Sequence, residues 1–69
     1  MTESDVLPFL TREWRTTLDI ARDVWDAEGQ RGDFSMVRTR VLHALSMLEK
    51  RGRVERNRAV LPHKWRLSP

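Results

Sequence analysis

Apolar residues recur with helical spacing over residues 35–51. Five of them fall at intervals of three and four: Val37, Val41, Ala44, Leu45 and Leu48. At about 100° per residue they form one stripe along a helix. Ser35 stands in front as the expected N-cap. Lys50 and Arg51 place positive charge in the last turn, and Gly52 supplies the left-handed residue that ends many helices. The pattern predicts a helix over 35–51.

A second helix is predicted over residues 17–28. Thr16 precedes it as an N-cap, and Asp19 occupies the position where a capping box places its acid. Gly29 and Gly32 end the pattern. Four apolar residues form the side that we expect to be buried: Leu18, Ala21, Val24 and Trp25.

A shorter helix is predicted over residues 5–13. Its apolar residues are spaced for one face: Val6, Leu7, Leu10 and Trp14. Pro8 is tolerated only in a first turn, so the helix must begin close to it. Two arrangements stay open. The capping signal at Thr16 favours a break before the second helix, and the alternative is one long helix over residues 9–28.

The period changes from helical to alternating after Gly52. Residues 53–56 and 64–67 alternate polar and apolar positions, and the stretch between them contains Asn57 and Pro62. Period two on both sides of a turn-rich segment indicates a β-hairpin. We therefore predict a hairpin over about 53–67 with three inward side chains: Val54, Trp65 and Leu67.

Charge divides the chain into two halves. Residues 1–30 hold three arginines against seven acids, a net charge of −4, and residues 31–69 hold ten basic residues against three acids, a net charge of +7. Eight of those ten are arginines, whose planar guanidinium suits phosphates and guanine edges. The basic half is expected to bind a polyanion, and nucleic acid is favoured over a merely solvated surface.

Several classes of function are disfavoured by what the chain contains. It has no cysteine, and His43 and His63 are 20 positions apart without a second ligand nearby, so no metal site or cofactor is expected. Residues with catalytic spacing and a phosphate-binding glycine loop are missing, so an enzyme is not expected. The 69 residues suggest one domain over 1–69, and the lack of a long apolar run suggests a cytoplasmic protein without membrane contact.

Three segments resemble the winged helix-turn-helix DNA-binding domain. The family's second helix opens with T-x-x-[DE]-I-A, and this chain has Thr16-Thr17-Leu18-Asp19-Ile20-Ala21. The recognition helix and its entry into the wing are similar to Val41-x-x-x-Leu45-x-x-Leu48-Glu49-x-x-Gly52-x-Val54-x-Arg56, and the returning strand to Lys64-Trp65-Arg66-Leu67. The resemblance implies an α+β fold of three helices followed by a β-hairpin wing, similar to small phage- and plasmid-type transcriptional regulators.

The side of the third predicted helix opposite its apolar stripe is rich in hydrogen-bonding groups. An α-helix fits the major groove, and the first turns of a reading helix reach deepest. We therefore expect sequence-dependent binding of double-stranded DNA by this helix through Ser35, Arg38, Thr39, Arg40, His43, Ser46 and Lys50. In the wing, the resemblance implies contacts to the backbone or minor groove by Arg56, Asn57, Arg58 and Lys64.

Other interpretations stay open beside this one. The tryptophans Trp14, Trp25 and Trp65 lie in phase with apolar neighbours, so core packing is favoured over base stacking. Leu42 and Met47 lie at the edges of the apolar stripe and could pack there; Leu42 could instead touch a thymine methyl or form a dimer contact. The alternative functions are a winged-helix module that binds an acidic protein and a nonspecific nucleic-acid binder. A homodimer is also open, since a single reading helix commonly gains affinity by pairing on two half-sites.

Overall fold

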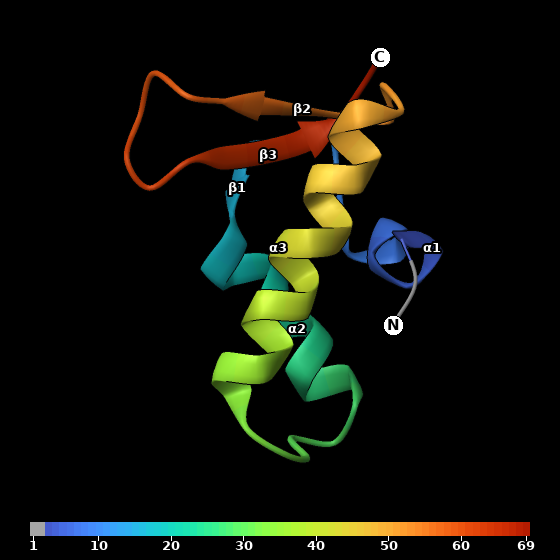
Figure 1. Ribbon diagram of the computed structural model, residues 1–69, viewed down its shortest axis with the longest axis vertical. Helices are drawn as coiled ribbons and strands as arrows, with labels where there is room; N and C mark the ends of the chain where they lie inside the picture. Colours follow the sequence, from blue (N-terminus) through green and yellow to red (C-terminus); the bar gives the residue numbers. More distant parts are fainter. Residues whose placement is uncertain (1–2) are drawn as a thin grey trace.

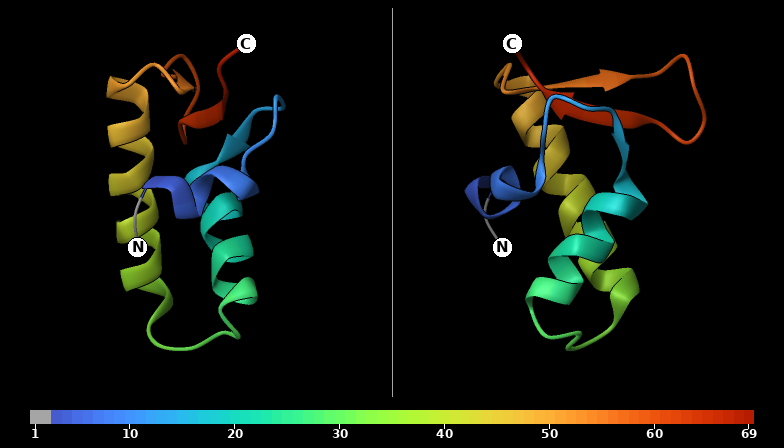
Figure 2. Two further views of the ribbon diagram at one scale, coloured as in Figure 1. Left: turned by 90° about the vertical axis from the view of Figure 1, so that its right-hand side faces the viewer. Right: turned by 180° about the vertical axis from the view of Figure 1, so that it is seen from behind.

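The computed structural model describes residues 3–69 and has an α+β fold (Figure 1). Two long helices, α2 (Thr17–Ala27) and α3 (Phe34–Lys50), pack against each other. A three-stranded antiparallel sheet lies at one end of this pair (Figures 1 and 2). A single turn of helix, α1 (Glu3–Val6), packs against α3. The α+β class is as expected, but the described chain holds two long helices and not three.

The helix predicted over residues 5–13 is wrong in length and type. The single turn of α1 passes into a 3-10 turn, η1 (Leu7–Phe9), and Leu10 is already extended with φ −102° and ψ 146°. Pro8 has no amide hydrogen to donate back into a helix, which suits the short turn. The amide of Leu10 donates to the carbonyl of Leu7 at 3.1 Å and closes it.

The backbone and side chain of Thr11 make hydrogen bonds that are incompatible with a helix at this position. The hydroxyl oxygen of Thr11 accepts from the amide of Glu13 at 3.1 Å, a local bond that competes with helix formation. The carbonyl of Thr11 accepts from the amide of Leu67 at 2.8 Å, which ties this segment to the end of the chain's last strand. Tertiary pairing thus overrides the apolar spacing that predicted a helix here.

A short strand, β1 (Arg15–Thr16), separates this segment from α2 and was not predicted. It pairs antiparallel with β3 (Lys64–Leu67), with Arg15 opposite Trp65 and Thr16 opposite Lys64. The break before the second helix is therefore confirmed, and the alternative of one helix over residues 9–28 is wrong.

Helix α2 begins and ends as the sequence predicts to within one residue. Thr16 is its N-cap, and its hydroxyl oxygen accepts from the amide of Asp19 at 3.1 Å. At the other end Gly29 adopts φ 78°, and the amide of Gln30 donates to the carbonyl of Trp25 at 2.8 Å. This left-handed cap satisfies carbonyls that the helix itself leaves free.

The buried side of α2 differs from the predicted one. Ala21 and Val24 are buried as expected, but Leu18 is 44% exposed, whereas Ile20 is fully buried. A shift of two positions rotates the buried face by about 200° on a helix, so the two residues occupy opposite sides. Helix α2 packs against both α3 and the segment before β1. The apolar pattern of α2 alone therefore did not show whether the side with Leu18 or the side with Ile20 is buried.

Helix α3 begins one residue earlier than predicted and is capped by a different residue. The carboxylate of Asp33 accepts from the amide of Ser35 at 2.9 Å, so Asp33 and not Ser35 is the N-cap. The predicted apolar stripe is fully confirmed, because all five of its side chains are buried. Gly52 ends the helix with φ 72°, and the amide of Arg53 donates to the carbonyl of Leu48 at 2.9 Å.

The predicted hairpin is present as β2 (Val54–Asn57) and β3, joined by residues 58–63. Strand β3 is central in the sheet, whose order is β1-β3-β2. Val54 and Trp65 are buried as expected, and Leu67 is partly buried against the core. We refer below to residues 54–67, the two strands with their connecting loop, as the wing.

The three tryptophans fill different places in the packing. Trp65 is fully buried, and its indole nitrogen donates to the hydroxyl of Thr17 at 2.8 Å. Trp25 is partly buried and meets the ring of Phe34 edge-on, with 5.3 Å between the centroids. Trp14 is also partly exposed and lies under the guanidinium of Arg66, 4.3 Å from the ring centroid. Core packing of tryptophan is therefore confirmed in full for Trp65 alone.

Candidate nucleic-acid interface

The outer side of α3 carries the polar side chains that the sequence placed there. Six of them are exposed and one, Ser46, is partly buried; the exposed ones are Ser35, Arg38, Thr39, Arg40, His43 and Lys50. The Thr39 hydroxyl donates to the carbonyl of Ser35 at 3.0 Å, which leaves its oxygen able to act as an acceptor. A helix with this surface can offer both donors and acceptors to base edges.

Arg38 and Arg40 lie on opposite flanks of α3. At about 100° per residue, two positions apart means about 200° around the helix axis. Arg40 borders a cavity of about 360 Å³ that opens toward α1 and α2. The two arginines therefore cannot both point at one groove in the same way, although the sequence analysis assigned both to the same DNA-reading surface.

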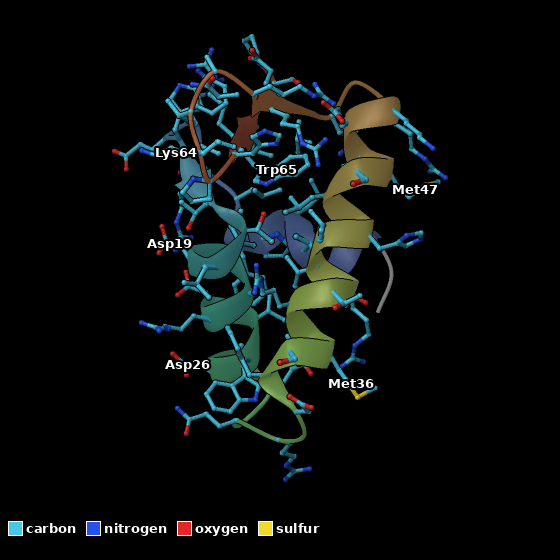
Figure 3. The ribbon with its side chains drawn as sticks, turned by 60° about the vertical axis from the view of Figure 1, so that its left-hand side comes forward. Asp19, Asp26, Met36, Met47, Lys64 and Trp65 are labelled. Carbon is cyan, nitrogen blue, oxygen red and sulfur yellow. The ribbon has the colours of Figure 1, made fainter. Side chains whose placement is uncertain are left out.

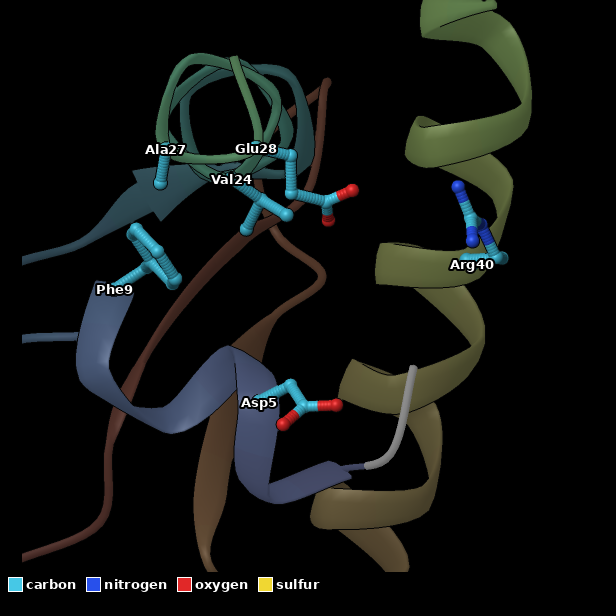
Figure 4. A pocket seen from close by; sticks show the side chains of 6 residues that line it. All are labelled: Asp5, Phe9, Val24, Ala27, Glu28 and Arg40. Atoms are coloured by element: carbon cyan, nitrogen blue, oxygen red, sulfur yellow. The ribbon is translucent and has the colours of Figure 1, made fainter. Parts of the chain in front are cut away.

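The cavity beside Arg40 has an acidic rim. Its lining combines the apolar side chains of Phe9, Val24 and Ala27 with the carboxylates of Asp5 and Glu28. Figure 4 shows both carboxylates directed into the space between their own segments and α3. Two carboxylates beside Arg40 offset its positive charge on this flank of α3.

The wing is joined to the other flank of α3 by Glu49. One carboxylate oxygen of Glu49 lies 2.9 Å from a guanidinium nitrogen of Arg58, and the other accepts a hydrogen bond from the same guanidinium at 3.1 Å. Arg56 adds a longer ion pair of 3.9 Å to the same carboxylate. A bidentate pair of this kind fixes direction as well as charge. It holds the wing's exposed arginine beside α3.

The remaining predicted wing residues are held by local contacts. Arg56 is only 19% exposed, and its guanidinium lies over the ring of Trp65 at 4.3 Å. The side-chain oxygen of Asn57 accepts from the amide of Ala59 at 3.0 Å and begins the loop. Lys64 is partly buried and faces Asn57 across the hairpin. Arg58, at 58% exposure, is thus the most accessible of the four.

The acidic side chains of α2 lie on a different side from the outer residues of α3. Figure 3 shows Asp19 and Asp26 on one side of the molecule and Met36 and Met47 on the other. Asp23 is paired with Arg15 at 2.7 Å, and that guanidinium also donates to the carbonyl of Phe9 at 3.0 Å. The acids of α2 thus lie apart from Met36 and Met47 of α3, whereas Lys64 of the wing lies on the side of the acids in Figure 3, and Asp5 and Glu28 lie beside Arg40.

Two features of this surface were missed in the sequence. Glu49 was assigned no role, because its partners are contributed by a strand and a loop that only the fold brings near. The apolar residues Val60 and Leu61 in the wing loop were also passed over, since a hairpin loop is expected to be polar. A run of Ala59 to Pro62 without a charge was the available signal.

Comparison with protein-family models, with curated proteins and with solved structures finds no match to this chain. Within residues 3–69, no helix is both long enough and apolar enough to cross a membrane.

Proposed function

We propose that this chain is a winged helix-turn-helix domain that binds double-stranded DNA in a sequence-dependent way. Helix α3 enters the major groove, and the wing contacts the backbone or the minor groove. The order of a long surface helix followed directly by a hairpin supports this, with α1 and η1 in the place of the family's first helix. Transcriptional regulation in the cytoplasm is the use that fits such a domain.

The observation that carries the proposal is the position of the wing beside the outer side of α3, where Arg58 pairs with Glu49. Glu49 follows Arg38 by eleven residues, so the two lie within about 20° of each other around the axis of α3. The wing is therefore fixed on the flank that also carries Arg38 near the start of the helix. A duplex that receives α3 from this side meets Arg38 and Arg58 together.

The two flanks of α3 assign different roles to its arginines. Arg38 lies in the first turns, on the wing side, and is the candidate to bind guanine O6 and N7. Arg40 faces the acidic cavity and is assigned to a weaker or indirect contact. Thr39 and His43 lie between these flanks and complete the reading surface.

Some wing residues hold the shape of the wing, and others supply positive charge for DNA phosphates. Arg56 is a positioning residue, because its stacking on Trp65 fixes the wing strand. Arg58 and Lys64 supply positive charge for phosphates, which orient the protein without reading sequence. Asn57 shapes the start of the loop.

The direct test is selection of bound sequences from a random duplex pool at near-physiological salt. We expect enrichment of a short motif, together with an affinity for that motif that falls steeply as salt rises. Binding of all duplexes alike would point to the nonspecific alternative. No binding to any duplex would overturn the proposal.

A protein-binding function is the second candidate, because the surface also carries exposed apolar side chains. Five large ones are more than a third exposed: Leu18, Met36, Leu42, Val60 and Leu61. A contiguous apolar patch is the usual mark of a protein-interaction site. These five are spread over α2, α3 and the wing loop, and an acidic protein or a second copy of the chain would be the corresponding partner.

A further inference from the structure

The tip of the wing is apolar and stands clear of the rest of the molecule. Leu61 is 88% exposed, more than any other large hydrophobic residue that the structure describes, and its neighbour Val60 is 38% exposed. In Figure 1 the loop that contains them projects beyond β1 and away from both long helices. An isolated exposed leucine is ordinary, but here two adjacent apolar residues and Pro62 occupy one projecting tip.

The base of the wing is built to hold this tip in place. Trp65, in the central strand, is fully buried and bonded to Thr17 of α2. Arg56 stacks on the same ring from the neighbouring strand, and Arg58 is held by Glu49. Two of these contacts join the wing to the helices, whereas the side chain of Leu61 is 88% exposed.

The charges around the tip identify the partner it fits. Arg58 precedes the apolar run, and Lys64 follows it. Glu49, the acid beside the wing, has its charge offset by Arg56 and Arg58. An apolar point between cationic side chains suits a polyanion with an apolar interior, which describes a DNA duplex: phosphates outside and stacked bases inside.

We propose that Leu61 is a wedge that enters the minor groove next to the α3 site, partly unstacks one base step and bends the duplex. This rests on the proposed DNA-binding function and adds a deformation to it. Leucine and proline are among the side chains that proteins insert between base steps from the minor groove, and such insertion kinks DNA by about 20–90°. Flexible pyrimidine–purine steps would then be favoured under the tip.

The size of the molecule is compatible with both contacts. Across the view of Figure 1 the chain extends 24 Å from the wing tip to α1, and α3 lies between them. The minor groove adjoining a major-groove site is about half a helical turn away, or about 17 Å. The spacing between the two grooves is therefore smaller than the width of the molecule that carries both α3 and the tip.

The test measures bending and unstacking on the duplex obtained by selection, with the full chain. The bend is followed by energy transfer between dyes at the two ends of the duplex. Unstacking is followed by 2-aminopurine placed in turn at each step on the wing side of the site. Leu61→Ala removes the wedge, Leu61→Met keeps it, and Leu42→Ala removes a leucine of similar chemistry from α3 as the matched control.

We expect the unaltered chain to bend the duplex and to raise the fluorescence of 2-aminopurine at one step. Leu61→Ala should abolish both signals and weaken binding by about threefold to thirtyfold. Leu61→Met should retain both, and Leu42→Ala should retain the bend whatever its affinity. Thermal melts should be unchanged in Leu61→Ala, because the residue is exposed.

Two results overturn the wedge while leaving DNA binding intact. One is a selected duplex that the unaltered chain binds without bending. The other is a bend and a fluorescence signal that persist in Leu61→Ala. If the chain binds no duplex at all, the proposed function fails first, and the wedge fails with it.

Discussion

The guanidinium of Arg56 lies 4.3 Å from the centroid of the Trp65 ring, across the pair of strands that forms the wing. The two residues are also direct partners in the register of β2 and β3. A cation over an indole face contributes about 0.5–2 kcal/mol, with the larger values where water is excluded. The contact links the charge of the wing to its only fully buried aromatic side chain among the described residues.

Arg56→Ala should therefore destabilise the fold more than a typical surface substitution. We expect the free energy of unfolding to fall by about 1–2 kcal/mol, because the stacking is lost and the ring of Trp65 is uncovered. Denaturant unfolding followed by tryptophan fluorescence measures this. Arg53→Ala is the control, since Arg53 is an exposed arginine just before the same strand and should change stability by less than about 0.5 kcal/mol. Equal effects of the two substitutions would remove the structural role of Arg56.

Buried and exposed leucines of α3 should differ in how much they contribute to stability. Leu45→Ala or Leu48→Ala should cost about 2–5 kcal/mol, since both side chains are buried and leave a cavity. In a chain this small that loss approaches the whole stability of the fold. Leu42→Ala deletes the same atoms from a side chain that is 42% exposed and should cost far less. Thermal melts that rank the three substitutions differently would contradict the packing of α3.

Arg38 and Arg58 should differ in the kind of binding energy they contribute. Arg38→Ala is expected to cost about 1–3 kcal/mol on the selected site and to relax base preference at one position. Arg58→Ala should weaken binding to selected and random duplexes by similar factors and make the salt dependence shallower by about one unit. Affinities must be compared at one salt concentration.

Arg40→Ala serves as the matched comparison for Arg38→Ala. It removes the same charge from the opposite flank of α3, so its effect on base preference should be smaller. The assignment of α3 as the reader would collapse if both helix substitutions acted uniformly on all duplexes while Arg58→Ala alone changed the preferred sequence.

Glu49→Gln should strengthen DNA binding. The substitution removes a negative charge that competes with phosphate for Arg58, while the pairing of β3 with β1 and the bond of Trp65 to Thr17 still hold the wing. We expect tighter binding at low salt, because Arg58 then meets phosphate without first leaving an ion pair. Stability should change by no more than about 1 kcal/mol, as for other exposed ion pairs.

Glu55→Gln is the control for this effect. Glu55 pairs with Arg66 within the sheet at 3.4 Å, so the same charge is removed without releasing Arg58. An equal gain in affinity for Glu55→Gln would show that net charge alone is responsible and that the Arg58–Glu49 pair has no special part.

The proposed orientation of the chain on DNA predicts which residues sense the duplex. In an NMR titration, chemical-shift changes should concentrate on α3 and the wing, while Asp19 and Asp26 should change little because their carboxylates would repel phosphate. Figure 3 places these two acids away from Met36 and Met47. Changes confined to α2 would reverse the proposed orientation.

The sequence predicted the elements whose signals are local. The five-residue stripe of α3, the Thr16 cap and the Gly52 stop each depend on neighbours in the chain, and each is confirmed. The first segment was predicted wrongly because Thr11 pairs with Leu67, a partner 56 positions away that no local pattern reveals. The short strand β1 was missed for the same reason, since it exists only through β3.

The candidate site was predictable in composition but not in arrangement. The exposed side of α3 follows directly from the opposite, apolar side, so its polar residues could be named in advance. That Arg40 faces Asp5 and Glu28 depends on how α1 and α2 pack. That Arg56 stacks on Trp65 depends on strand register, because the two residues are nine positions apart and meet only when the hairpin closes.

The position of β3 has a consequence for how the chain acquires its structure. Strands β1 and β2 each pair with β3 and not with each other, so the sheet has no stable part that lacks residues 64–67. During folding, α2 and α3 can form from local contacts, but the wing and the N-terminal segment can pair only once β3 is in place. Because these contacts join residues about 50 positions apart, their closure should set the folding rate.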